Sequence, residues 1–122
     1  MVVLHLLQAK DTRKNLMMTN DLVVVYTTAS NSEDAQMLAT NAIERRLAAC
    51  VQIEAIQSVY RWKGEVQSEP EQRVLFKTTI ALYPQLESMI TELHPYELPA
   101  IFATPVVAAS SAYAAWVREA VG

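Results

Sequence analysis

The alternation of apolar and polar positions predicts a strand followed by a helix at the start of the ordered chain. Residues 21–28 form a continuous β-branched run, typical of a central strand covered on both faces. Ser30, with Glu33 three residues later, indicates a capping box that opens a helix of about four turns. The apolar face expected for this helix consists of Ala35, Leu38, Ala39, Ala42, Ile43 and Leu47.

A long hairpin is predicted next. Residues 49–61 and 65–79 have strand character, and Lys63-Gly64 between them supplies a tight turn, because glycine tolerates positive φ. Pro70 interrupts the polar outer half of the second arm and confines it to a sheet edge or a bulge. Both arms exceed the usual strand length of about 5–6 residues, so the tip should project beyond the core.

The remaining pattern predicts a helix, a short strand and a last helix. Pro84 suits the first turn of the second helix, which His94-Pro95 ends, and residues 100–106 form an apolar strand after Pro99. Ser110 or Ser111 can cap a C-terminal helix. The expected apolar face of that helix contains Tyr113, Trp116, Val117 and Ala120.

This element order, β-α-β-β-α-β plus a last helix, predicts the α+β class and a ferredoxin-like split βαβ sandwich with two helices on one face of the sheet. The other face needs a cover, from the last helix or from a neighbouring subunit. Hydrophobic residues make up 52% of the 122 residues and charged residues only 19%, which favours self-association.

Composition also restricts location and partners. The net charge is −3, and no basic run is longer than Arg45-Arg46, which argues against nucleic acid. Residues 2–7 are too short an apolar run for a secretory signal or a membrane span. The single cysteine, Cys50, excludes an internal disulfide, so we expect a buried thiol and a reducing cytoplasm. We expect residues 1–20 to be a disordered extension, with a native start at Met17 or Met18, and 21–122 to be one domain.

Motifs in a fixed order give the chain a family resemblance. They are AACV at 48–51, YRWKG at 60–64, FKTT at 76–79, HPYELP at 94–99 and the closing stretch at 113–116. Over about residues 21–121 the chain resembles the CutA divalent-cation-tolerance family. The resemblance implies a ferredoxin-like subunit in a PII-like homotrimer, linked to tolerance of copper and other divalent cations. The implied cofactor is a divalent metal ion, Cu²⁺ or a similar one.

The resemblance also points to specific ligand positions. In some members copper binding is tied to a cysteine at the end of the first strand and to paired histidines before the Pro-Tyr motif. The corresponding residues here are Thr27 and the pair Leu93-His94, so only His94 retains such a ligand. Because Cu(I) prefers sulfur ligands, this argues against a high-affinity Cu(I) site.

Six residues are the candidate site. His94 is a candidate metal ligand, with Glu97 as a carboxylate partner, although a helix C-cap role is favoured. Tyr60 and Trp62 are candidates for an inter-subunit ligand cleft or, more commonly, interface anchors. The remaining ligand-binding candidates are Tyr96, Glu97 and Lys77. Lys77, in an apolar strand, needs Glu97, a neighbouring subunit's carboxylate or an anionic ligand as its partner.

The favoured function is a non-enzymatic trimer that binds a metal ion or small ligand at inter-subunit clefts. The alternative is a trimeric assembly or signalling module that binds a protein or metabolite without metal. An acylphosphatase-like hydrolase would need Arg45, Arg46 and Asn41 around a phosphate, but these lie on the predicted first helix. The chain has only two glycines, too few for a glycine-rich phosphate loop.

Overall fold

The computed structural model describes residues 21–122 and shows a mixed α+β fold. Its elements are β1 (Leu22–Ala29), α2 (Ser32–Glu44), β2 (Cys50–Trp62), β3 (Glu65–Thr79), the short 3-10 helix η1 (Ile80–Leu82), α3 (Tyr83–Leu93), β4 (Phe102–Pro105) and α4 (Ser111–Val121). The main elements follow the predicted order; η1 was not predicted, and β4 is shorter than expected. The predicted extension at 1–20 lies outside the described residues.

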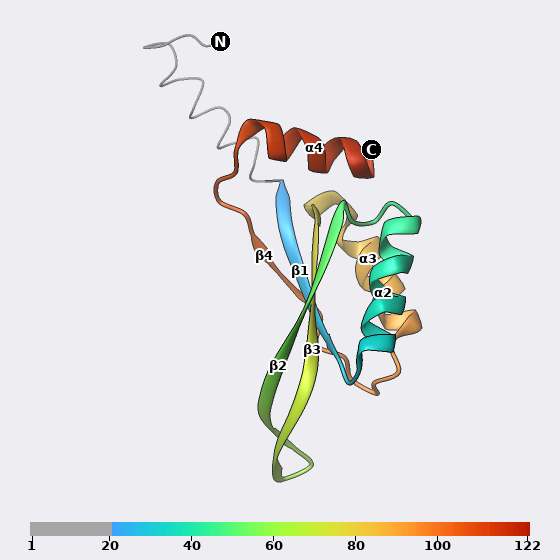
Figure 1. The fold of residues 1–122 in the computed structure, drawn as a ribbon, viewed down its shortest axis with the longest axis vertical. Helices are drawn as coiled ribbons and strands as arrows, with labels where there is room; N and C mark the ends of the chain where they lie inside the picture. The colour runs from blue at the N-terminus through green and yellow to red at the C-terminus, as the bar shows by residue number, and fades with distance from the viewer. Residues whose placement is uncertain (1–20) are drawn as a thin grey trace.

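The four strands form one antiparallel sheet in the order β2-β3-β1-β4. Helices α2 and α3 pack side by side on one face of this sheet (Figure 1). We call this side the covered face and the opposite side the open face. The main core lies between the sheet and the two helices, with Val25, Val74 and Phe76 from the strands fully buried.

Strand β1 shows how differently the two faces are shielded. Val23, Val25 and Thr27 point to the covered face and are buried. Val24, Tyr26 and Thr28 alternate with them, point to the open face and are only partly buried. The prediction of a strand covered on both faces is therefore fulfilled on one face only within a single chain.

Helix α2 differs from the prediction at both ends. Its N-cap is Asn31 rather than Ser30, since the Asn31 side chain accepts a hydrogen bond of 2.8 Å from the Asp34 backbone N–H. At the other end Arg46 has φ of 57°, and the Leu47 N–H donates to the Ala42 carbonyl at 2.9 Å. This Schellman-type ending returns Leu47 to the core after the helix has stopped.

The predicted apolar face of α2 also needs one correction. Ile43 is exposed, whereas Ala35, Leu38, Ala39 and Ala42 are buried as expected. The helix therefore presents a narrower apolar stripe to the sheet than the sequence pattern indicated.

The hairpin is long and continuous, as predicted. Strands β2 and β3 pair from Cys50↔Lys77 to Trp62↔Glu65, and Lys63 and Gly64 both have positive φ, as a tight two-residue hairpin turn requires. Pairing of β3 with β1 stops at Ala29↔Gln72. Residues 56–71 therefore form a two-stranded hairpin arm that extends past the rest of the sheet (Figure 1). Pro70 lies on the free edge of this arm, which confirms the edge prediction.

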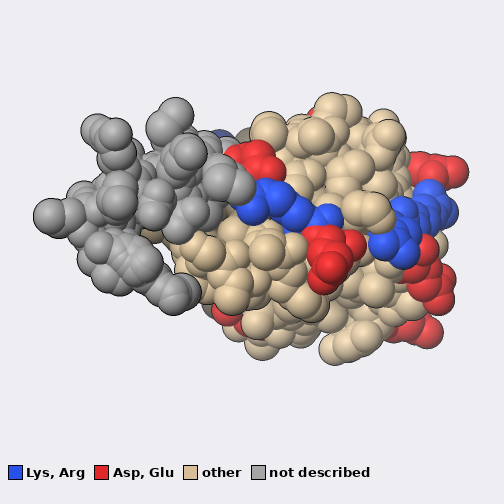
Figure 2. Space-filling view, turned by 90° about the horizontal axis from the view of Figure 1, so that it is seen from above, with Lys and Arg blue, Asp and Glu red and all other residues tan. Residues whose placement is uncertain are grey.

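The predicted face of helix α4 is confirmed at Val117 but wrong at Tyr113 and Trp116. Ala114 and Val117 are buried against Leu22, whereas Tyr113 and Trp116 are exposed. The helix lies across one end of the sheet, so it leaves most of the open face uncovered (Figure 1). Viewed from above that end, most of the described surface is uncharged, and basic and acidic groups lie next to one another (Figure 2).

Candidate functional site

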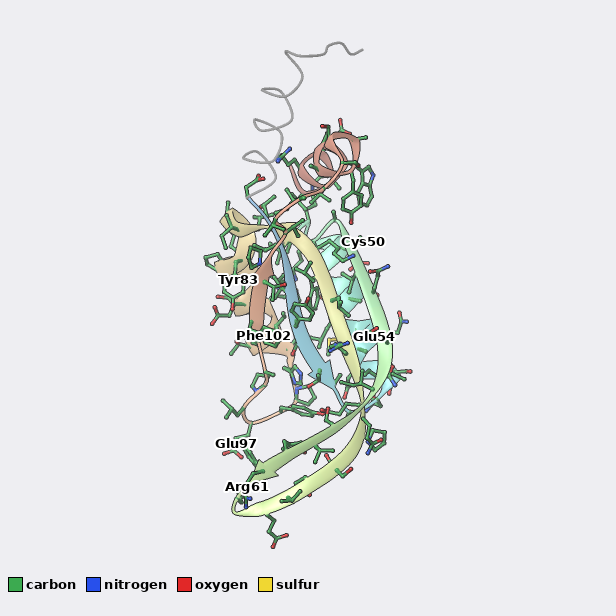
Figure 3. All side chains as sticks on the ribbon, turned by 90° about the vertical axis from the view of Figure 1, so that its left-hand side faces the viewer. Cys50, Glu54, Arg61, Tyr83, Glu97 and Phe102 are labelled. Atoms are coloured by element: carbon green, nitrogen blue, oxygen red, sulfur yellow. The ribbon has the colours of Figure 1, made fainter. Side chains whose placement is uncertain are left out.

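A cleft lies between the hairpin arm and the loop that follows α3. Its volume is about 660 Å³. Figure 3 shows Glu97 on this loop, level with the curved arm that ends near Arg61. We call this cavity the arm cleft. Its lining comprises Thr28, Ser30, Ser58, Val59, Tyr60, Trp62, Glu69, Glu71, Tyr96, Glu97, Leu98 and Ala100.

Two tyrosine–glutamate pairs organise the cleft. The Tyr60 hydroxyl donates to Glu69 Oε1 at 2.7 Å, and the Tyr96 hydroxyl donates to Glu71 Oε2 at 2.6 Å. The bond to Glu69 raises the pKa of Tyr60, and burial followed by the bond to Glu71 raises the pKa of Tyr96. Both phenols therefore stay protonated near neutral pH, and each holds a carboxylate in place.

The electrostatic character of the cleft is acidic. Glu69, Glu71 and Glu97 contribute carboxylates, and none of the lining residues is lysine, arginine or histidine. The ion pairs found between residues 21 and 122 involve none of these three glutamates. The cleft is thus suited to a cationic ligand and unsuited to an anionic one.

His94 holds the cleft loop against the sheet. It is the C-cap of α3 and is buried. Its Nε2 lies 2.7 Å from the Thr28 carbonyl oxygen, and its Nδ1 accepts a 3.1 Å hydrogen bond from the Tyr96 backbone N–H. Because Nδ1 accepts, Nε2 carries the proton and donates to Thr28. The imidazole fixes the position from which Tyr96 reaches Glu71.

These bonds bear on the prediction that His94 is a metal ligand. Both ring nitrogens are engaged, so the imidazole would have to release a backbone partner before it could bind a metal. Thr27, at the position of the family's cysteine, points into the core, and its hydroxyl has no hydrogen-bond partner. The metal role of His94 stays a prediction, while its contacts agree with the favoured structural role.

Lys77 lies away from the cleft. Its Nζ donates to Gln52 Oε1 at 2.8 Å on the open face. The pairing with Glu97 that was considered for Lys77 is not formed within the described chain. The alternatives, a neighbouring subunit's carboxylate or an anionic ligand, stay predictions.

The structure brings four of the six candidate residues together in the cleft lining: Tyr60, Trp62, Tyr96 and Glu97. The sequence pattern did not single out Glu69 and Glu71, which lie in the polar outer half of the second arm and line the cleft. Their spacing of two residues was the available signal, because it places both side chains on one side of β3.

The described residues contain neither a ready metal-binding cluster nor a membrane-spanning helix. Within residues 21–122, no cluster of three or more His, Cys, Asp or Glu side chains has a geometry that could hold a metal ion. None of the helices in the same range is both long and apolar enough to cross a membrane. Cys50 is a free cysteine that is half-buried, whereas a buried thiol was expected.

Comparisons with known proteins agree with one another. Residues 23–120 match the family model described as CutA1 divalent ion tolerance protein. The divalent-cation tolerance protein CutA of Thermus thermophilus is 41% identical over 100 residues, which are 81% of this chain and 97% of that protein. Its counterpart in Thermotoga maritima is 39% identical, covering 82% and 99%. The structure of CutA from Synechococcus elongatus superimposes with a TM-score of 0.83 at 42% identity, covering 85% of this chain and 93% of that one.

Proposed function

The chain belongs to the CutA1 divalent ion tolerance family, and from this membership we propose that it acts as a non-enzymatic homotrimer that binds a cation or small ligand in clefts between its subunits. The arm cleft, with its three carboxylates and no basic side chain, is the observation that carries the cation-binding part of this proposal. In this proposal the protein acts in a reducing cytoplasm.

The sheet supports the trimeric part of the proposal. Its strand order and the two helices on one face suit a ferredoxin-like, PII-like subunit, which leaves the open face for assembly. Phe102 on this face is half exposed and stacks on Tyr26, with ring centroids 4.9 Å apart. An exposed aromatic pair on the uncovered face of a sheet, here on β1 and the edge strand β4, is the kind of group that subunit interfaces bury.

The carboxylates of the cleft support metal-ion binding only if a neighbouring subunit supplies further ligands. Carboxylate oxygens bind many divalent cations, but the ligands must converge at about 2.0–2.6 Å. Since no three such groups converge within the described chain, a metal ion would need carboxylates or other donors from a neighbouring subunit as well. This is why we place the ligand between subunits.

The non-enzymatic part of the proposal rests on what the candidate catalytic residues do. Arg45 and Arg46 lie at the end of α2, where Arg45 contacts Glu92 and Arg46 donates to the Gly122 carbonyl. They are on the opposite side of the sheet from the open face, and neither lines the arm cleft. Their contacts are structural.

Native mass spectrometry of metal-stripped protein, followed by titration with Cu²⁺, Zn²⁺ and Cd²⁺, tests this proposal. We expect a trimer that takes up cations in proportion to its subunits. The double variant Glu69→Gln/Glu71→Gln should lose uptake, while Glu44→Gln, an exposed change on α2, should retain it. A monomeric protein, or metal uptake unaffected by the double variant, would contradict the proposal.

His94→Ala, measured in the same titration, separates the two roles of the histidine. We expect lower thermal stability because the bonds to Thr28 and Tyr96 are lost. Unchanged cation stoichiometry would assign His94 a structural role alone. A trimer that binds no metal, but recruits a protein partner independently of metal, would favour an assembly module instead.

A further inference from the structure

Glu71 is a mostly buried residue whose carboxylate forms no ion pair within the described chain. Only 8% of the residue is exposed, and its one hydrogen bond comes from the neutral Tyr96 hydroxyl. Buried charges in proteins are normally paired, because transfer of an unpaired ion from water is costly. Among the described residues Thr27 Oγ1 is the only buried side-chain oxygen without a partner, so the second oxygen of Glu71 reaches solvent. That oxygen is available to a cation that enters the arm cleft, which Glu71 lines.

The shape and lining of the cleft favour an organic cation over a bare metal ion. A volume of about 660 Å³ is far larger than a metal ion needs, and the described carboxylates do not converge on one point. The lining residues include the aromatic Tyr60 and Trp62 and the apolar Leu98. Aromatic faces attract ammonium groups, and apolar walls accommodate an aliphatic stem.

The spacing of the carboxylates indicates the length of the ligand. Glu69 and Glu71 are two residues apart on the same side of β3, a separation of about 7 Å along a strand. Each holds a tyrosine hydroxyl on one oxygen, at Glu69 Oε1 and Glu71 Oε2, and has its second oxygen free of hydrogen bonds within the described chain. A short aliphatic chain with an ammonium group at each end spans such a distance.

We propose that the arm cleft binds a short aliphatic diamine as a dication, with one ammonium group on Glu71 and the other on Glu69. This inference rests on the proposed function, because it uses the same cleft and gives its ligand a chemical class. Glu97, an exposed residue that also lines the cleft, adds negative charge that attracts the ligand. Tyr96 and Tyr60 act as positioning residues that hold the two carboxylates.

Isothermal titration calorimetry on the full chain, with cadaverine as the probe, tests the proposal. Pentanediol, which has the same carbon chain and no charge, is the matched neutral control. We expect saturable binding of cadaverine and none of pentanediol. Glu71→Gln and Glu69→Gln should each weaken binding by about tenfold or more, because each removes a charge-assisted hydrogen bond. Glu44→Gln should bind as the wild type does.

Further outcomes decide between this inference and the wider proposal. Metal ions that bind through Glu69 and Glu71 while cadaverine does not would overturn the diamine inference and leave the proposed function intact. If neither metal ions nor cadaverine binds, both fail. If Glu71→Gln weakens subunit association while cadaverine has no effect on wild type, a basic side chain of a second copy fills the cleft, and the inference is wrong. Thermal unfolding of each variant confirms that it is folded.

Discussion

The two phenylalanines of this chain lie on opposite faces of the same sheet. Phe76 on β3 is 0% exposed and sits in the core beneath α2 and α3, whereas Phe102 on β4 is 52% exposed on the open face. The covered face is closed by elements of its own chain. The open face contains half-exposed aromatic and charged side chains that no element of the described chain covers. The first face explains how a subunit folds, and the second bears on assembly and binding.

Truncation of each phenylalanine should separate these roles most strongly. Phe76→Ala should lower the free energy of unfolding by about 3–5 kcal/mol, because it leaves a cavity in a closed core. Phe102→Ala should leave the subunit folded and instead weaken association, so its effect should depend on protein concentration. Urea unfolding and native mass spectrometry at two concentrations measure both. An equal, concentration-independent loss of stability in the two variants would contradict the distinction between the faces.

Two buried threonines on the covered face allow a second comparison, with smaller expected changes in stability. Thr78 donates to the Leu47 carbonyl at 2.7 Å, whereas the Thr27 hydroxyl has no partner. Removal of an unsatisfied buried hydroxyl relieves a desolvation cost. Thr27→Val should therefore raise the free energy of unfolding by about 1 kcal/mol, and Thr78→Val should lower it by about 1–3 kcal/mol.

Chemical denaturation of the two threonine variants and the wild type, at one protein concentration, makes this comparison. A loss of stability in Thr27→Val comparable with that in Thr78→Val would mean that the Thr27 hydroxyl does have a partner. Both threonine hydroxyls on the covered face would then be hydrogen-bonded, and the two residues would not differ in this respect.

The sequence predicted the covered face better than the open one. Periodicity located β1, α2, the hairpin and α3, because burial of these elements depends on neighbours that the pattern itself implies. It misplaced the α2 cap by one residue because Ser30 and Asn31 are both good capping residues. Backbone geometry decides between them: Asn31 has the extended φ and ψ of an N-cap.

Helix α4 and the arm cleft show why some features could not be predicted from the sequence. The predicted face of α4 contained Val117, but Tyr113 and Trp116 have the same three-residue spacing as Ala114 and Val117, so periodicity cannot tell which of these pairs is buried. The small Ala114 fits where the helix crosses the end of the sheet. The cleft depends on contacts such as Tyr96 with Glu71, 25 residues apart, and on the course of the arm, neither of which a local pattern encodes.

The smallest expected effect concerns the ion pair between Arg73 and Glu54 on the open face. Arg73 Nη2 lies 2.6 Å from Glu54 Oε1, and the two side chains are 44% and 48% exposed in the single chain. Exposed pairs contribute about 0.2–1 kcal/mol, and salt at about 1 M screens them. A double-mutant cycle of Arg73→Met and Glu54→Gln, measured by urea unfolding in low and high salt, should give a coupling energy in that range that falls as salt is added. A larger coupling that persists in high salt would mean that a neighbouring subunit shields the pair, which would extend the interface from Phe102 across the sheet to β2. A coupling that fades in salt would confine the buried part of the interface to the β1–β4 side.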